Sequence, residues 1–331
     1  MLRKLSLTLC FALLAAATLY AQKIHVDEIS IDTRATFHQQ TLDGKYSSSF
    51  LGDYLNLHIK GQLTDNLSFR VRQRLNRAPS LENPFNATDF LMLRWQPFTH
   101  WAFTAGKQAI LLGGYEIDSA PIDVYYYGTY CEHMHQVYAF GLTANYLPAE
   151  GQEVILQFCP SPCWGGVADA YSYNLYWNGS FAPFWKTTWS VNFIQDQWYR
   201  WMNYIVLGNR FFMGPLALDI DFHNRASFAQ KRFFLSDYSI IGKAILTLGK
   251  WNLCTKVGYE TNATENVDED GWDYDTILAA GTNYFYAGAG VEYFPLGNDN
   301  LRLHAVWFRD NTLNLNHYDM GITWRFSLFK R

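Results

Sequence analysis

A row of arginines at Arg70, Arg72 and Arg74 is the first feature of this sequence that could do chemistry. Apolar residues such as Phe69 and Val71 alternate with them, and a period of two predicts a β-strand with one cationic and one apolar face. Side chains two residues apart on a strand are separated by roughly 6–7 Å. Guanidinium groups keep their charge, are weakly hydrated and bind oxyanions in a bidentate manner. This row is therefore suited to passing anions from one group to the next.

The apolar face of this strand determines where the arginines must point. An arginine facing lipid at mid-bilayer costs roughly 2–4 kcal/mol, so a lipid-facing apolar side requires a water-filled lumen on the other. Rows of Arg and Lys favour anion passage, and a wall of low dielectric constant focuses their field. We therefore expect a basic lumen wall formed by His58, Lys60, Arg70, Arg72, Arg74, Arg94 and Lys107.

A long segment, residues 109–134, follows these basic strands and carries Glu116, Asp118 and Asp123. We expect it to fold into the barrel as a constriction loop, with its acids opposite the basic wall. Acids on one side of the lumen and basic residues on the other would produce an electric field across it. Such a field orients dipolar solutes and gives a mild ion preference. In the alternative interpretation these acids pair permanently with the arginines, which then only solvate the wall.

Catalytic and cofactor motifs are missing from the sequence. It contains no nucleophile elbow and no His-Glu-x-x-His motif, no glycine-rich phosphate cradle, and no Cys/His spacing typical of zinc. We therefore expect no enzymatic activity, no cofactor and no metal. Cys159 and Cys163 either form a small disulfide or stay unpaired, because two prolines in the gap restrict the geometry.

The composition excludes several classes of protein. Aromatic residues make up 18% of the 331 residues and charged residues 17%, which is incompatible with intrinsic disorder. A formal net charge of -4 argues against a basic nucleic-acid-binding protein. Beyond the first twenty or so residues no apolar run is long enough for a membrane helix. Alternating segments with aromatics near the turns are instead typical of an outer-membrane β-barrel, and a soluble all-β domain is the less favoured interpretation.

Turn signals set the expected number of strands. Short turns are indicated near residues 64–66, 97–100, 148–152, 182–184, 214–215, 249–250 and 295–300. Their spacing fits one hairpin of two membrane strands plus a loop, since a tilted strand takes roughly 9–11 residues. The prediction is an all-β, transmembrane antiparallel barrel of sixteen strands with short periplasmic turns and long extracellular loops. Fourteen or eighteen strands stay open, because residues 276–293 have no cleanly apolar face.

The N-terminus predicts export. Arg3 and Lys4 precede an apolar run, and small residues lead to Ala21, as in a secretory signal peptide. We expect residues 1–21 to be cleaved and residues 22–331 to form a single barrel domain in the outer membrane of a Gram-negative bacterium.

Several segments together resemble a known family. They are Leu-Ser-Phe-Arg-Val-Arg-Gln at 67–73, Asp-Phe-Leu-Met-Leu-Arg-Trp at 89–95, Thr-Ala-Gly-Lys-Gln at 104–108 and Gly-Gly-Tyr-Glu at 113–116. This pattern resembles the phosphate-selective porin O and P family, especially its divergent Bacteroidota-type members. The resemblance implies a sixteen-strand barrel, often trimeric, that carries small solutes past an arginine ladder. Lys107 is the one clear candidate for the lysine cluster at that family's constriction.

These observations predict a passive channel for small hydrophilic solutes with a leaning toward anions such as phosphate. Its expected partners are outer-membrane lipid and lipopolysaccharide, the solutes themselves and two further copies in a homotrimer, with no nucleic acid. Two alternatives stay open. Loop aromatics such as Tyr125, Tyr126, Tyr127 and Trp164 suit a carbohydrate transport barrel, and a plugged barrel would serve a structural or secretion-associated role.

Overall fold

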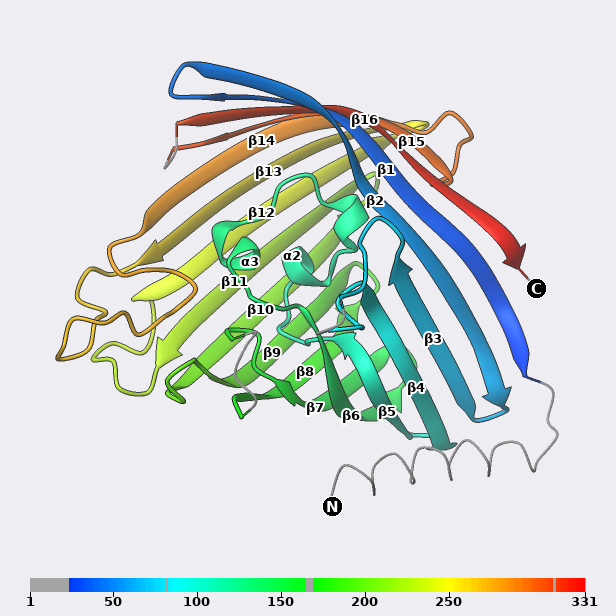
Figure 1. The fold of residues 1–331 in the computed structure, drawn as a ribbon, viewed down its shortest axis with the longest axis horizontal. Helices are drawn as coiled ribbons and strands as arrows, with labels where there is room; N and C mark the ends of the chain where they lie inside the picture. The colour runs from blue at the N-terminus through cyan, green and yellow to red at the C-terminus, as the bar shows by residue number, and fades with distance from the viewer. Residues whose placement is uncertain (1–23, 81–82, 165–168, 312–313, 331) are drawn as a thin grey trace.

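The computed structural model describes residues 24–80, 83–164, 169–311 and 314–330. Sixteen antiparallel strands follow one another around a ring, and β1 pairs with β16 to close it (Figure 1). The predicted all-β barrel of sixteen strands is confirmed. The predicted signal peptide, residues 1–21, lies outside the described residues.

The strands are β1 (His25–Leu42), β2 (Lys45–Thr64), β3 (Leu67–Arg74), β4 (Thr88–Phe98), β5 (Trp101–Ala109), β6 (Tyr138–Ala149), β7 (Gln152–Pro160), β8 (Tyr171–Ala182), β9 (Trp185–Gln195), β10 (Trp201–Met213), β11 (Leu216–Ser227), β12 (Asp237–Leu248), β13 (Trp251–Asn262), β14 (Asn283–Tyr293), β15 (Leu301–Asp310) and β16 (Leu315–Lys330). Three short helices, α2 (Tyr115–Asp118), η1 (Pro121–Asp123) and α3 (Thr129–Glu132), all lie between β5 and β6.

All seven predicted short turns join neighbouring strands at one end of the barrel. β4 ends at Phe98 and β5 begins at Trp101, for example. Gly214 has φ +60° and Gly249 φ +61°, a left-handed conformation that glycine adopts without steric cost. Glu28 of β1 pairs with Lys330 of β16, so both described chain ends lie at this short-turn end, and the long loops gather at the other.

The alternating residues separate into an outer and an inner face. On β4, Leu91, Leu93 and Trp95 are exposed on the outside, while Met92 and Arg94 line an internal cavity. Large exposed aromatics such as Trp95, Phe98 and Trp101 lie beside the short turns, where interface girdles form.

None of the helices in the described residues is long and apolar enough to span a membrane.

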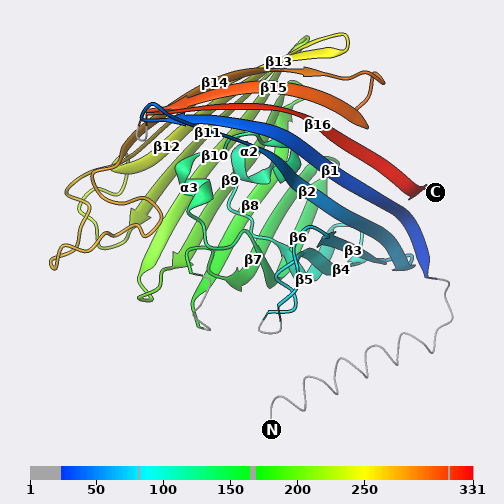
Figure 2. The same ribbon diagram turned by 45° about the horizontal axis from the view of Figure 1, so that its top comes forward.

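Residues 110–137, which we call the inward segment, enter the barrel between β5 and β6. α2 and α3 lie inside the ring of strands in both views (Figures 1 and 2). Ile110, Leu112 and Tyr130 are almost completely buried and join a hydrophobic cluster with wall residues such as Ile194. At Gly114, φ is +84° and an added Cβ would lie 2.9 Å from the His223 ring, so glycine allows the segment to pass close to β11.

The four cysteines in the described part of the chain, Cys131, Cys159, Cys163 and Cys254, are all unpaired. The Cys159–Cys163 disulfide, one of the two possibilities left by the sequence, is therefore not formed in this structure.

Candidate functional site in the barrel lumen

The arginine row lies on β3 and faces the interior. The register places Lys60 opposite Arg70 and His58 opposite Arg72 on β2. Arg70, Arg72 and Arg74 border two internal cavities, one of ≈ 290 Å³ shared with β1 and β2 and one of ≈ 840 Å³ between the wall and the inward segment. The structure therefore brings five of the predicted pore-lining residues together on adjacent strands.

Two members of the row have a carboxylate partner. Arg72 Nε lies 3.0 Å from Asp89 Oδ2, and Arg74 Nε lies 2.9 Å from Asp89 Oδ1. Asp89 is only 4% exposed and stands near the start of β4, beside the end of β3. The acid that pairs with Arg72 and Arg74 is therefore Asp89, and the alternative interpretation, in which acids of the inward segment pair with the row, is wrong. Antiparallel pairing of two successive strands could have indicated this partner.

Arg70 has no ion pair among the described residues. Its guanidinium lies over the Phe90 ring, with Cζ 4.1 Å from the ring centroid, and its Nε makes no hydrogen bond. Arg72 packs on the same ring at 4.4 Å. Stacking on an aromatic face fixes a guanidinium in place without neutralising its charge, so Arg70 is the member of the row whose charge is least compensated.

The other basic residues of this wall are paired. His58 Nε2 lies 3.1 Å from Asp32, Lys60 Nζ 2.9 Å from Glu28, and Arg94 3.1 Å from Glu153. Asp32 and Glu28 come from β1, whose inward-facing acids were not identified from the sequence.

The structure shows that the expectation for Lys107 is wrong, because this residue does not line the pore. Its register partners are Leu91 on β4 and Phe140 on β6, both of which are exposed on the outer face. Lys107 Nζ donates a 2.7 Å hydrogen bond to the Phe85 carbonyl. The physical reason is parity, because Lys107 lies on the same side of β5 as Trp101 and Phe103.

The acids of the inward segment reach walls other than the arginine row. Glu116 lies 2.6 Å from Lys256 on β13, and Asp118 accepts a 2.7 Å hydrogen bond from the Tyr176 hydroxyl on β8. Asp123 binds Arg302 on β15 and Arg325 on β16. Asp123 also borders the ≈ 290 Å³ cavity that the arginine row lines, and Asp118 borders the ≈ 840 Å³ cavity, so two of the three acids share a cavity with the row.

The protein environment shifts the pKa of two of these carboxyl groups in opposite directions. Burial acts to raise the pKa of Asp123, but Arg302 and Arg325 outweigh it and hold the pKa below its ordinary value. Desolvation deep in the barrel raises the pKa of Asp118, and the bond from Tyr176 opposes this only in part. Because the Asp118 side chain also faces the lumen and is exposed there, cavity water limits this rise.

The ≈ 840 Å³ cavity carries an excess of cationic side chains. Its charged lining comprises Arg70, Arg72, Arg74, Arg94 and Arg210 against Asp118 and Glu153. Arg210, on the far side at β10, is paired with Asp219 at 2.5 Å and was not identified from the sequence. Low-dielectric walls focus the field of such a set into the space between them.

A buried ionic network anchors the inward segment to the wall opposite the row. Arg225, fully buried on β11, contacts Asp237 at 2.7 Å and Asp275 at 3.2 Å. Glu260 on β13 accepts hydrogen bonds from the backbone N–H groups of Thr129 (2.7 Å) and Tyr130 (3.1 Å). These residues lie far apart in the sequence, so no local pattern could have brought them together.

Comparison with known proteins agrees with this architecture. Residues 24–179 match the family model described as phosphate-selective porin O and P. The chain therefore has a porin-like barrel fold and is similar to this family over just under half of its length. The matched part runs from the start of β1 into β8 and includes the arginine row, so the resemblance expected from the sequence is confirmed. No curated protein matches this chain significantly.

Solved structures share the fold of this chain. An anion-selective porin from Comamonas acidovorans has a TM-score of 0.62 at 8% identity, covering 92% of this chain and 100% of its own. OprB from Pseudomonas putida has a TM-score of 0.64 at 10% identity, with 91% and 94% covered. The trimer form of OmpT from Vibrio cholerae has a TM-score of 0.61 at 12% identity, with 92% and 100% covered.

Proposed function

We propose that this protein is a porin, a passive channel for small hydrophilic solutes with a preference for anions, set where the inward segment narrows the lumen against the arginine row. The observation that carries the proposal is the cationic excess of the ≈ 840 Å³ cavity, together with Arg70, which forms no ion pair among the described residues. The porin from Comamonas acidovorans, which shares this fold, is anion-selective and supports the same direction. Solutes pass without a catalytic step and without a cofactor.

We also propose the context in which the channel works. Residues 22–331 form the single mature domain after loss of residues 1–21, in contact with lipid and lipopolysaccharide. Three copies assemble, as in the trimer form of OmpT.

A planar-bilayer recording tests the channel proposal. The folded barrel is expected to give discrete conductance steps, and a salt gradient should shift the reversal potential toward the anion equilibrium potential. A barrel that inserts but conducts no current would support the plugged, structural alternative, and a shift in the cation direction would contradict the proposed selectivity.

A second candidate substrate class is carbohydrate. Tyr115, Tyr127, Tyr138 and Tyr176 line the same cavity as the arginines, and aromatic rings stack on sugar rings. Concentration-dependent block of the ion current by a maltooligosaccharide, with no matching block by phosphate, would favour this alternative.

The raised pKa of Asp118 leads to a prediction of how the ion selectivity of the channel depends on pH. Its pKa is raised, so this carboxylate takes up a proton at a higher pH than an ordinary one, and the cavity then loses one negative charge. We expect the anion-to-cation permeability ratio to rise as pH falls from about 7 to about 5, the range opened by an upward shift of a carboxyl pKa. The reversal potential measures this ratio.

The matched control for this prediction is Asp118→Asn, which cannot titrate and still offers an acceptor to Tyr176. Its permeability ratio should be higher than that of the parent at neutral pH and should change less with pH. An identical pH dependence in the two proteins would assign the titration to another group.

A further inference from the structure

A cluster of three metal-ligating side chains lies where the barrel closes. His38 is on β1, and His317 and Asp319 are on β16. The register pairs His38 with Asp319 directly. Tyr318, between the two β16 residues, is exposed on the outer face. His317 and Asp319 therefore point inward, and His38 shares the side of its partner Asp319.

The three side chains are already arranged around one point. His38 Nδ1 lies 2.7 Å from Asp319 Oδ1, and His317 Nε2 lies 2.8 Å from Asp319 Oδ2. The two imidazole rings meet edge to face at 74° with centroids 4.2 Å apart. Each residue offers one ligand atom, and these three ligand atoms lie within 4.8 Å of one another.

We propose that His38, His317 and Asp319 form a binding site for a divalent transition-metal ion such as Zn²⁺. Two histidines and one carboxylate are a donor set that zinc uses in open sites, where water fills the fourth position. A neutral imidazole carries its proton on either ring nitrogen. With the protons on His38 Nε2 and His317 Nδ1, the lone pairs of His38 Nδ1 and His317 Nε2 point toward Asp319. A metal ion then takes the place of the hydrogen bonds that the other two tautomers donate to Asp319.

The surroundings give a cation access to this site. His317 lines a cavity of ≈ 700 Å³ at the long-loop end, which residues of the inward segment such as Tyr126 also line. The charged lining of that cavity, apart from its histidines, comprises Glu132, Asp273, Asp275 and Asp310 against Arg34. An acidic vestibule raises the local concentration of cations. The Tyr126 ring of the inward segment lies 6.0 Å from the His317 ring, so a bound ion would lie beside the constriction.

The number of residues between β1 and β16 explains why motif spacing did not reveal this site. His38 and Asp319 are 281 positions apart in the chain. Zinc motifs detectable in a sequence depend on ligands a few residues apart, whereas here the closing strand pair brings the ligands together.

The test is metal binding by the full, folded barrel purified without a histidine tag and stripped with EDTA. Isothermal titration with Zn²⁺, and absorption spectra with Co²⁺ as a probe, should show one ion per chain. Asp319→Asn and His317→Gln should each weaken binding about tenfold or more, since even residues that only support a ligand change affinity by 10–100-fold.

The matched control is His100→Gln. His100 is exposed at a short turn, and its Nδ1 lies 2.8 Å from the Leu147 carbonyl, so this variant should bind Zn²⁺ like the parent. The change in gel mobility on heating checks that each variant is folded, and His38→Gln replaces any variant that is not.

Two results would overturn the proposal. One is the absence of saturable Zn²⁺ binding by the parent, and the other is equal affinity in the parent and in folded Asp319→Asn. Crystals of the parent soaked in Zn²⁺ provide a test without any variant. Anomalous density is expected between the two imidazoles, and its absence there at full occupancy of another site would contradict the assignment.

Discussion

Replacing residues 115–127 of the inward segment by a short Gly/Ser linker is expected to raise single-channel conductance about twofold or more, because pore diameter limits ion flow. This stretch holds α2 and η1, and α2 lies inside the ring of strands (Figure 1). Its residues form one side of the ≈ 840 Å³ cavity whose other side is the arginine row. Ile110 and Leu112 before it and Tyr130 after it stay in place as buried anchors.

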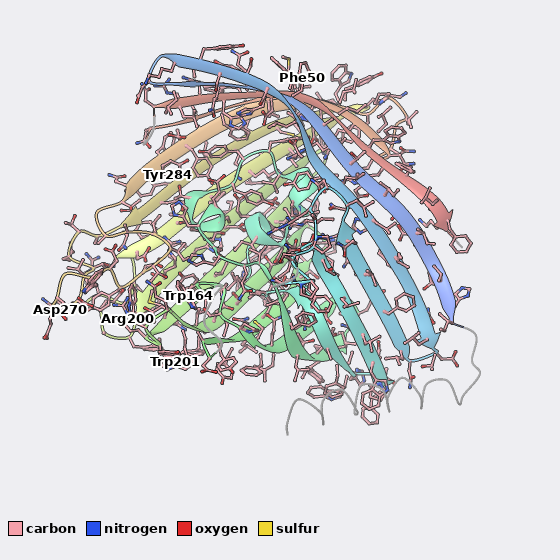
Figure 3. The ribbon with its side chains drawn as sticks, in the orientation of Figure 1. Phe50, Trp164, Arg200, Trp201, Asp270 and Tyr284 are labelled. Atoms are coloured by element: carbon pink, nitrogen blue, oxygen red, sulfur yellow. The ribbon has the colours of Figure 1, made fainter. Side chains whose placement is uncertain are left out.

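A matched deletion separates the effect of the constriction from that of any shortened loop. Residues 269–271 lie at the exposed tip of the loop between β13 and β14, and Figure 3 shows Asp270 at the far end of that loop, away from the lumen. Their removal should leave conductance unchanged. If both deletions, in barrels that keep their heat-dependent gel mobility, conduct like the parent, the inward segment does not limit the current.

The excision also removes charge, and a second pair of variants accounts for this. Glu116→Gln and Asp123→Asn neutralise the acids that bind Lys256 and Arg302 while keeping the bulk of the segment. They should alter selectivity more than conductance, whereas excision should alter both.

Much of the barrel could be predicted because its signals are local. The alternation of Leu91, Leu93 and Trp95 with Met92 and Arg94 records directly which side of β4 faces lipid. Short turns at the ends of strands have a characteristic residue composition that can be recognised in the sequence. The number of strands followed from these turns, even though residues 276–293 had no clear pattern of their own.

The parts that were mispredicted depend on pairing between strands. Lys107 was placed in the lumen by its charge, yet its parity on β5 matches Trp101 and Phe103, and its register partner Leu91 is exposed on the outer face. Asp89 was not recognised as the partner of Arg72 and Arg74. The contacts of the inward segment with Lys256 and Arg302 join residues more than a hundred positions apart, which no local pattern encodes.

The second large effect is expected at the arginine row, where the choice of variant is decisive. Asp89 is buried and pairs with both Arg72 and Arg74. Replacing only those arginines would leave an uncompensated buried carboxylate, which costs about 3–5 kcal/mol. Arg70→Gln avoids this difficulty, because Arg70 has no ion pair among the described residues. A triple variant, Arg72→Gln with Arg74→Gln and Asp89→Asn, removes the rest of the row together with its partner.

Both variants reduce the net charge of the lumen by one, and both should fold and insert normally. We expect Arg70→Gln to have the larger effect, since Arg70 is the member of the row that forms no ion pair among the described residues, whereas Arg72 and Arg74 are paired with Asp89. The control is Arg309→Gln. Arg309 is exposed at the long-loop end and donates to Asn314 and Asn316, away from both cavities that the row lines.

The reversal potential of Arg70→Gln in a salt gradient is the most direct test of this account. At about 0.1 M salt, where the screening length is about 10 Å, the anion-to-cation permeability ratio should fall about twofold or more relative to the parent and to Arg309→Gln. At about 1 M, where screening acts within about 3 Å, the difference should shrink. A folded Arg70→Gln channel with the same low-salt reversal potential as the parent would contradict the claim that the arginine row sets selectivity.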